Sequence, residues 1–184
     1  MADPPAGALS VTSQIGSLRS WRHAGLVEEP VELRDAAQLL VVNAAGQGIP
    51  FGAVYREQKT IVVFVRHFLC YACKEYVEDL GKIPKKLLQD ANVRLVVIGQ
   101  SSHHHIKPFC TLTGYPHEMY VDPEREIYRT LGMKRGEAAT SSGNEIHFVH
   151  LDKNKLDHAH INTVLQLAGV QTVNFTNRSQ IIDV

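Results

Sequence analysis

Two apolar, β-branched runs joined by a helical stretch constrain the fold of this 184-residue chain more than any other feature. The runs at 60–65 and 93–98 show no alternation of polar and apolar residues, which indicates strands buried on both faces. The helical stretch between them is broken at Pro84. Strands linked in this way form a βαβ unit, so we expect them to run parallel with a right-handed crossover.

Helices and strands continue to alternate along the rest of the chain. We expect strands at 118–121 and 146–151, helices at 31–38, 101–113, 122–131 and 157–168, and a polar loop at 137–144. This order predicts an α/β sandwich with a mostly parallel or mixed sheet. We assign residues 29–184 to this domain. Residues 1–28 are rich in Ala, Gly, Ser and Pro, and we assign them to a flexible tail.

Composition and charge exclude several functional classes. Nineteen basic residues balance nineteen acidic ones, which disfavours a protein that binds nucleic acid through a broad basic field. The longest interior apolar run, 61–65, is far shorter than the ~20 residues that span a bilayer. The first residues lack the pattern of a secretory signal, and three cysteines are too few for a disulfide scaffold. We expect a protein of the cytosol or nucleus that binds neither nucleic acid nor a membrane.

A Cys-x-x-Cys pair carries the strongest chemical signal. Cys70 and Cys73 directly follow the first buried strand and open the next helix, where the helix dipole and unpaired backbone N–H groups stabilise a thiolate. Cys73 shares a helix face with Tyr76, Val77 and Leu80, which indicates that it faces the core. We therefore predict that Cys70 is the attacking thiolate and that Cys73 is the shielded, resolving thiol.

Two cationic residues complete the candidate catalytic set. Arg66 and His67 follow the strand at the edge of the sheet where α/β proteins bind ligands, and we expect their charge to favour the thiolate. We predict no cofactor and no metal ion. Two alternatives stay open: a zinc site formed by Cys70, Cys73 and a histidine, and a pair of inert structural cysteines.

Other candidate residues are weaker. In the run at 103–105, one histidine could face the thiol pair as a proton shuttle, or all three could be solvated in the first turn of a helix. Three successive helical residues point about 100° apart, so they cannot all bind one metal ion. Cys110 lies on the apolar face of its helix, and we expect a small core residue.

Four separate segments resemble, in order, the peroxiredoxin-like proteins of the 2C type, which carry an AhpC/TSA antioxidant-enzyme domain. The segments are 65–76, 96–102, 120–128 and 131–136. The resemblance implies a thioredoxin-like, three-layer α/β sandwich with a mixed sheet. It also implies antioxidant or disulfide-exchange chemistry at Cys70 and Cys73, with a protein thiol or disulfide, or a small peroxide, as the reaction partner.

The chain departs from the peroxiredoxin signature Pro-x-x-x-Thr-x-x-Cys. Where that signature needs threonine and proline, this chain has Cys70 and Arg66, or His67 and Val63, depending on which cysteine is aligned. It also has no proline after Pro123, so the cis-proline loop of thioredoxins is missing. These departures favour a second hypothesis, a catalytically weak regulatory module that acts through protein partners in signalling or metabolic regulation.

A further departure concerns length. Proteins of this family carry an insertion and a glycine-flanked apolar strand between Gly136 and Ile146, where this chain has residues 137–145 alone. We therefore expect one core strand of the usual sheet to be missing, as in a shortened splice-type form. Loss of a central strand removes part of the core and the backbone partners of its neighbours.

This shortening predicts a difference in stability. A chain restored to the family length should unfold at a higher temperature than this chain, because the added strand buries apolar surface and pairs backbone groups. Thermal unfolding followed by circular dichroism measures the two midpoints. Equal midpoints would refute the expectation.

Overall fold

The computed structural model describes residues 31–133, 139–142, 148–151 and 158–175, so the proposed tail and Asp157 lie outside the described residues. Helical elements are α1 (Val31–Ala36), α2 (Phe51–Tyr55), α3 (Tyr71–Gly81), α4 (Lys85–Asp90), the 3-10 turn η3 (His103–His105), α5 (Ile106–Thr113), α6 (Glu126–Thr130) and α7 (Ile161–Leu167). Strands are β1 (Leu40–Val42), β2 (Gly48–Pro50), β3 (Thr60–Val65), β4 (Arg94–Gly99), β5 (Glu118–Val121), β6 (Ala139–Ser142) and β7 (Phe148–Leu151).

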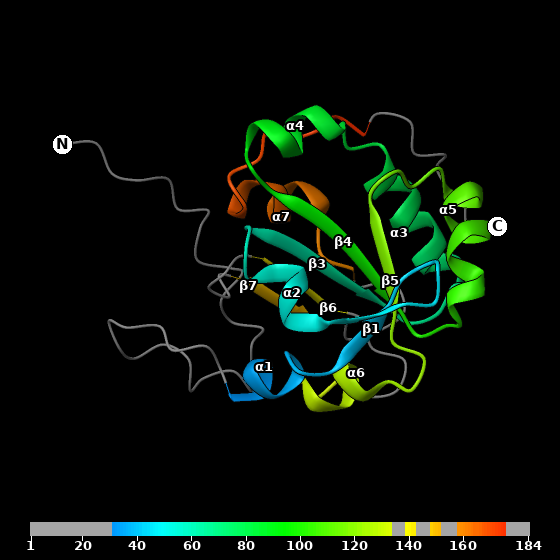
Figure 1. Cartoon of the computed structure of the whole chain (residues 1–184). Coiled ribbons are helices and arrows are strands. Elements are labelled where there is room, and N and C mark those ends of the chain that lie inside the picture. Colours follow the sequence, from blue (N-terminus) through cyan, green and yellow to red (C-terminus); the bar gives the residue numbers. More distant parts are fainter. Residues whose placement is uncertain (1–30, 134–138, 143–147, 152–157, 176–184) are drawn as a thin grey trace.

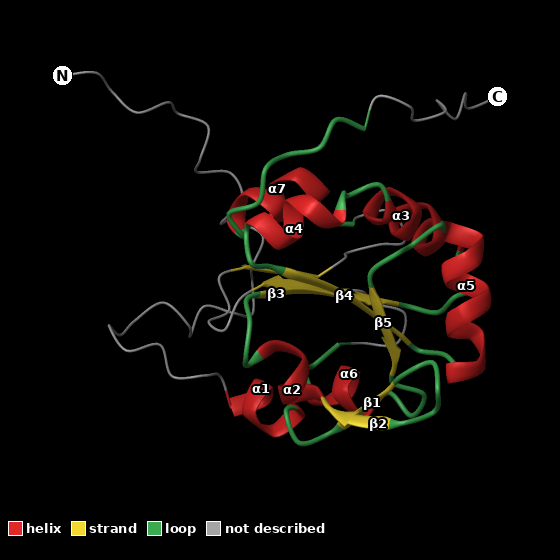
Figure 2. Ribbon diagram, turned by 45° about the horizontal axis from the view of Figure 1, so that its top comes forward, coloured by secondary structure: helices red, strands yellow, loops and turns green. Residues whose placement is uncertain are grey.

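The strands form one mixed sheet in the order β2-β1-β5-β4-β3-β6-β7 (Figure 1). β4 pairs in parallel with both β3 and β5, whereas β6 pairs antiparallel with β3 and β7. Figure 2 shows α3, α4 and α7 on one face of the sheet and α1, α2 and α6 on the other. The predicted three-layer α/β sandwich with a mixed sheet is therefore confirmed.

The central strand β3 divides the core into two halves. All six of its residues are buried. Ile61, Val63 and Val65 pack with side chains of α3, α5 and α7, whereas Val62 and Phe64 pack with side chains of α1, α2 and α6. The run without polar alternation therefore lies between two helical layers, as the sequence predicts.

Helix α6 starts later than the sequence suggests. Arg125 has a left-handed backbone (φ 58°), so the helix cannot begin at the Asp-Pro dipeptide. Asp122 still caps this helix, because its carboxylate accepts hydrogen bonds from the backbone N–H groups of Glu126, Ile127 and Tyr128 at 2.9–3.3 Å. Helix α7 likewise starts at Ile161, after an extended residue.

The predicted polar loop at 137–144 contains a strand. Residues 139–142 form β6, which pairs antiparallel with β3 over four positions from Ile61 to Phe64. The loop prediction was therefore wrong for these four residues. The buried strand β3 has backbone N–H and C=O groups that need partners, and pairing them outweighs the weak strand preference of Ala-Thr-Ser-Ser. Although the chain is shortened, β3 therefore has a paired neighbour at these four positions.

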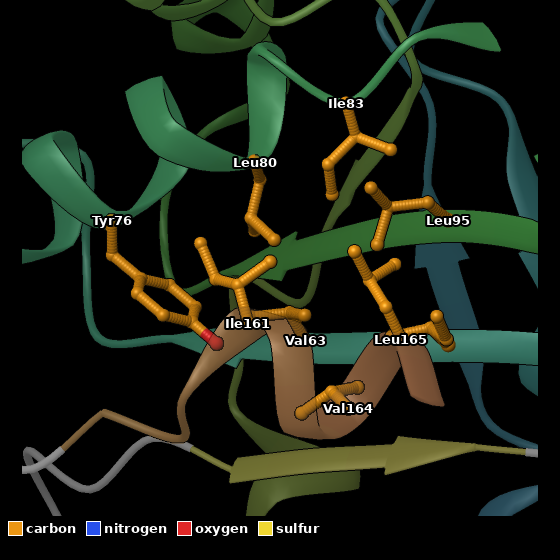
Figure 3. Close-up of a pocket in the computed structure, with 9 residues that line it drawn as sticks. Val63, Tyr76, Leu80, Ile83, Leu95, Ile161, Val164 and Leu165 are labelled. Atoms are coloured by element: carbon orange, nitrogen blue, oxygen red, sulfur yellow. The ribbon is translucent and has the colours of Figure 1, made fainter. Parts of the chain in front are cut away.

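A small apolar cavity lies between α3, α7 and the central strands (Figure 3). Its lining side chains are Ile61, Val63, Tyr76, Leu80, Ile83, Leu95, Ile161, Val164 and Leu165. Figure 3 shows Ile161 and Leu165 of α7 facing the side chains of α3 and β4. Because unfilled apolar space forfeits van der Waals contacts, the packing beneath α7 can be improved.

Among the described residues, no helix is long and apolar enough to cross a membrane.

The cavity predicts that a larger side chain at Val164 stabilises the protein. In Val164→Ile, the added methylene should fill empty space and raise the free energy of unfolding by up to about 1 kcal/mol. Val77→Ile is the matched control, because Val77 is fully buried in the same half of the core but does not line the cavity. Overpacking should make the control less stable by roughly 1–3 kcal/mol. Urea unfolding measures both changes, and equal destabilisation by both substitutions would contradict the account.

Candidate functional site

The two cysteines lie at the N-terminus of α3, one turn apart. Cys70 is the N-cap residue, with an extended backbone (φ −81°, ψ 117°), and Cys73 lies in the first turn. The backbone N–H of Cys73 donates a hydrogen bond to the Cys70 sulfur at 3.4 Å. The Cys70 sulfur thus takes the place of the oxygen that usually caps a helix, where negative charge is favoured. The structure therefore has the strand–turn–helix geometry that the sequence predicts.

The two thiols differ in exposure. Cys70 is half-buried, whereas the Cys73 side chain is fully buried, and both are free thiols. The pKa of the Cys73 thiol is raised to about 11, chiefly by burial and also by a hydrogen bond with Cys70, while hydrogen bonds from Arg66 act in the opposite direction. Cys73 is therefore protonated at neutral pH. An accessible thiol next to a shielded, protonated one is the arrangement that an attacking and resolving pair requires.

Arg66 directly follows β3 and is 6% exposed. Its carbonyl oxygen accepts a hydrogen bond from the backbone N–H of Gln100 at 3.2 Å, which fixes the main chain beside β4. Its main chain and, more weakly, its side chain lower the pKa of the Cys73 thiol. The sequence prediction that the Arg66 charge favours the Cys70 thiolate stays a prediction.

His67 and Phe68 shape the loop that leads to the thiols. The side chain of His67 is exposed, and its carbonyl oxygen accepts a hydrogen bond from the Cys70 N–H at 3.1 Å. The buried Phe68 ring stacks on Phe109 of α5, with ring centroids 4.3 Å apart. It also covers Gly99, where a Cβ atom would come within 2.4 Å of the ring. A glycine at the end of β4 thus allows the aromatic ring to fix the loop.

Sequence reasoning missed the role of Phe68 and Gly99. The signals were present, because Gly99 directly follows a buried strand and Phe68 is an apolar residue in a short loop. The residues that flank Cys70 point outward instead: Leu69 is 94% exposed and Tyr71 is 67% exposed. The half-buried thiol thus lies between two exposed apolar side chains.

Tyr128 supports the site from the opposite layer. Its buried hydroxyl lies 2.6 Å from the carbonyl oxygen of Val65 and 2.7 Å from that of Ile98, at the ends of β3 and β4. Burial raises its pKa well above the usual value, and nearby Asp122 and Cys73 act in the same direction. The neutral hydroxyl therefore donates one hydrogen bond that is shared by two carbonyl oxygens, at the ends of β3 and β4. Sequence reasoning did not identify this hydrogen bonding.

The three histidines lie in η3, at the end of the loop that follows β4. The rings of His103 and His104 are 3.9 Å apart, and His103 lies against Gly46. The Nδ1 atom of His105 is 2.8 Å from the Ser101 hydroxyl oxygen. Within the described ranges, no three His, Cys, Asp or Glu side chains gather to hold a metal ion. The structure thus offers no support for zinc bound by Cys70, Cys73 and a histidine among these residues.

Cys110 lies on α5, apart from the helix that carries the other two cysteines. It is half-buried, and its sulfur donates a hydrogen bond to the Met119 sulfur at 3.7 Å. Burial raises the pKa of its thiol, which disfavours the reactive thiolate. It packs against the larger core half, in agreement with the predicted core role.

The family comparison matches a segment that begins after Cys70 and Cys73. The family model described as AhpC/TSA antioxidant enzyme matches residues 79–167. Peroxiredoxin-like 2C of Homo sapiens is 54% identical over 192 residues, and the match covers 80% of this chain and 85% of the human protein. Prostamide/prostaglandin F synthase of Xenopus tropicalis is 35% identical over 107 residues, which cover 57% of this chain and 52% of that protein.

Solved structures show the same fold. Peroxiredoxin Q of Xanthomonas campestris superposes with a TM-score of 0.63 at 14% identity, covering 77% of this chain and 94% of that chain. A secreted disulfide oxidoreductase of Mycobacterium tuberculosis superposes with a TM-score of 0.54 at 9% identity, covering 73% of this chain and 97% of that chain. At such identities the likeness establishes the thioredoxin-like fold alone.

The alignment with the human relative also reveals an internal difference in length. It spans 192 positions but covers 80% of this 184-residue chain, or about 147 residues, so about 45 positions of the alignment have no counterpart in this chain. The shortening inferred from the sequence agrees with this difference. Identity of 52–54% with the human and Mus musculus proteins, over 85% of their length, shows that the chain belongs to the peroxiredoxin-like 2C family.

Proposed function

We propose that this protein is a thiol oxidoreductase in which Cys70 attacks the substrate and Cys73 resolves the intermediate. The observation that carries the proposal is a half-buried Cys70 thiol at the N-cap of α3, whose sulfur accepts a hydrogen bond from the backbone N–H of Cys73, while the Cys73 thiol itself is fully buried one turn later. Membership of the peroxiredoxin-like 2C family and the likeness to a peroxiredoxin and a disulfide oxidoreductase support it.

The reaction follows from the difference between the two thiols. The Cys70 thiolate attacks one sulfur of a substrate disulfide, forms a mixed disulfide and releases the other sulfur as a thiolate. Cys73 then loses its proton and attacks the Cys70 sulfur. The Cys70–Cys73 bond forms, the bond to the substrate breaks, and the second substrate sulfur leaves. The dithiol is oxidised and the substrate disulfide is reduced to two thiols. A dithiol reductant returns the protein to its starting state.

The surroundings of Cys70 favour a disulfide over a peroxide as the first substrate. The chain lacks the threonine and proline of the peroxiredoxin signature. Exposed Leu69 and Tyr71 offer apolar contacts on both sides of the thiol. These contacts suit a polypeptide more than a small peroxide. We propose a protein disulfide as substrate, in the cytosol or nucleus, with a small peroxide as the second substrate class.

A second candidate is a binding module whose cysteines are not needed for function. The same exposed pair, Leu69 and Tyr71, favours it, because exposed apolar side chains are typical of protein contacts. Binding of a partner that persists when Cys70 and Cys73 are both replaced by serine would decide for this candidate. If the variant with both cysteines replaced no longer binds the partner, this candidate is wrong.

Replacing each cysteine separately tests the proposed roles. Cys70→Ser should abolish reduction of a small disulfide such as oxidised glutathione, because the attacking sulfur is removed. Cys73→Ser should accumulate the mixed disulfide on Cys70, because no second thiol can release it. Mass spectrometry of the intact protein identifies each species. Cys110→Ser is the matched control and should react like the wild type. Equal oxidation of Cys70→Ser and wild type would contradict the assignment.

The buried Cys73 thiol also predicts a pH dependence of stability. Its pKa is about 11 in the folded protein, raised mainly by burial from an ordinary value of 9.0. The folded state thus holds this proton more tightly than the unfolded state, so the stabilisation is complete below pH 9 and is lost as the pH rises toward 11. Relative to Cys73→Ser, reduced wild-type protein should become less stable in urea over this range. If the two proteins differ in free energy of unfolding by the same amount at every pH from 8 upward, this prediction is wrong.

A further inference from the structure

The turn between β5 and α6 holds an arginine in a backbone conformation that disfavours it. Arg125 lies in the left-handed region, with φ 58° and ψ 29°. In the described part of the chain, the other residues with positive φ are four glycines and Asn92. Glycine tolerates this region because it has no Cβ atom, and asparagine because its side chain can hydrogen-bond locally. Arginine has neither advantage, so the backbone at this position is strained.

The side chain of Arg125 adds a second unfavourable feature. Its Nε and Nη2 atoms are buried and have no hydrogen-bond partner in the described part of the chain. Buried polar groups almost always have a partner, and a buried donor without one is destabilising. The carboxylate of Asp122 does not serve as this partner and accepts backbone N–H groups of α6 instead. Backbone strain and unpartnered donors thus coincide at one residue, which is typical of a functional site.

The two unpartnered atoms form one edge of the Arg125 guanidinium. By the covalent geometry of arginine, the Nε–H bond and one Nη2–H bond point in the same direction. Such an edge binds both oxygens of a carboxylate, or two oxygens of a phosphate, through a pair of parallel charge-assisted hydrogen bonds. The group that would satisfy this edge is therefore an oxyanion.

Gln100 adds a third unpartnered donor at the same end of the sheet. Its Nε2 atom is also buried and without a hydrogen-bond partner. Gln100 directly follows β4, and Asp122 directly follows β5, which pairs in parallel with β4. The Asp122 N–H donates to the Gly99 carbonyl oxygen at 2.9 Å, and the Asp122 carbonyl oxygen accepts the Arg125 N–H at 3.2 Å. Arg125 and Gln100 therefore extend from adjacent strand ends, on the side of the sheet where α/β proteins bind ligands.

We propose that Arg125 and Gln100 bind a small oxyanion, a carboxylate or a phosphate group, at the carboxyl ends of β4 and β5. The guanidinium edge supplies two hydrogen bonds and the positive charge, and the Gln100 amide supplies a third hydrogen bond. Arg125 as a whole is partly exposed, so an ion can reach it from solvent. The acidic neighbours Glu124 and Glu126 are exposed, where water and salt screen their charge. The site includes neither thiol of the Cys-x-x-Cys pair and is independent of the proposed function.

Thermal unfolding with inorganic phosphate, acetate or chloride tests this site. At equal pH and ionic strength, millimolar phosphate or acetate should raise the unfolding midpoint of the wild type by about 2–4 °C relative to chloride. In Arg125→Gln this rise should be lost, because the charged edge is removed. Arg129→Gln is the matched control, since it removes an exposed arginine of α6 and should keep the wild-type response. A rise with one anion alone supports the site and identifies its ligand as a phosphate or a carboxylate.

Two further measurements keep the test decisive. Arg125→Gly suits the left-handed backbone, so it replaces Arg125→Gln if that variant does not fold, and it should likewise show no response to either anion. In the ¹H–¹⁵N spectrum of the wild type, the Nε–H signal of Arg125 should shift when the stabilising anion is added. The proposal is overturned if neither anion raises the wild-type midpoint, if the Arg125 variant that folds responds like the wild type, or if the Nε–H signal does not move.

Discussion

The carboxyl end of β3 is the constraint on which the whole site depends. The carbonyl oxygen of Val65 accepts a hydrogen bond from Tyr128, and that of Arg66 accepts one from Gln100. The next loop is fixed by the Phe68 ring over Gly99. These contacts leave little freedom in the main chain before Cys70. The first thiol therefore meets the start of α3 at a defined place, and the second follows one helical turn later.

The site derives its chemical asymmetry from this placement. Two identical side chains become different because one caps the helix near the surface and the other lies on the core face. Burial raises the pKa of the second thiol, and Arg66, the buried residue directly after β3, opposes that effect. The geometry that buries Cys73 thus also places Arg66 where it lowers the pKa of that thiol.

Much of the fold was predictable because local patterns and tertiary packing agree. The apolar runs of β3 and β4 leave no ambiguity about burial, and the face shared by Cys73 and Leu80 fixes the orientation of α3. β6 was not predictable, because Ala-Thr-Ser-Ser has little strand preference and pairs through the backbone needs of β3. The effect of Arg66 on the pKa of Cys73 was also hidden, since sequence spacing places a residue near a site but does not say which sulfur it affects.

The most direct test of the central claim is to map the disulfides of the wild-type protein after titration with one equivalent of a disulfide oxidant. Peptide mapping by mass spectrometry should find a single bridge between Cys70 and Cys73, with Cys110 still a free thiol. Oxidation that falls on Cys110, or that leaves Cys70 and Cys73 unbridged, would contradict the account.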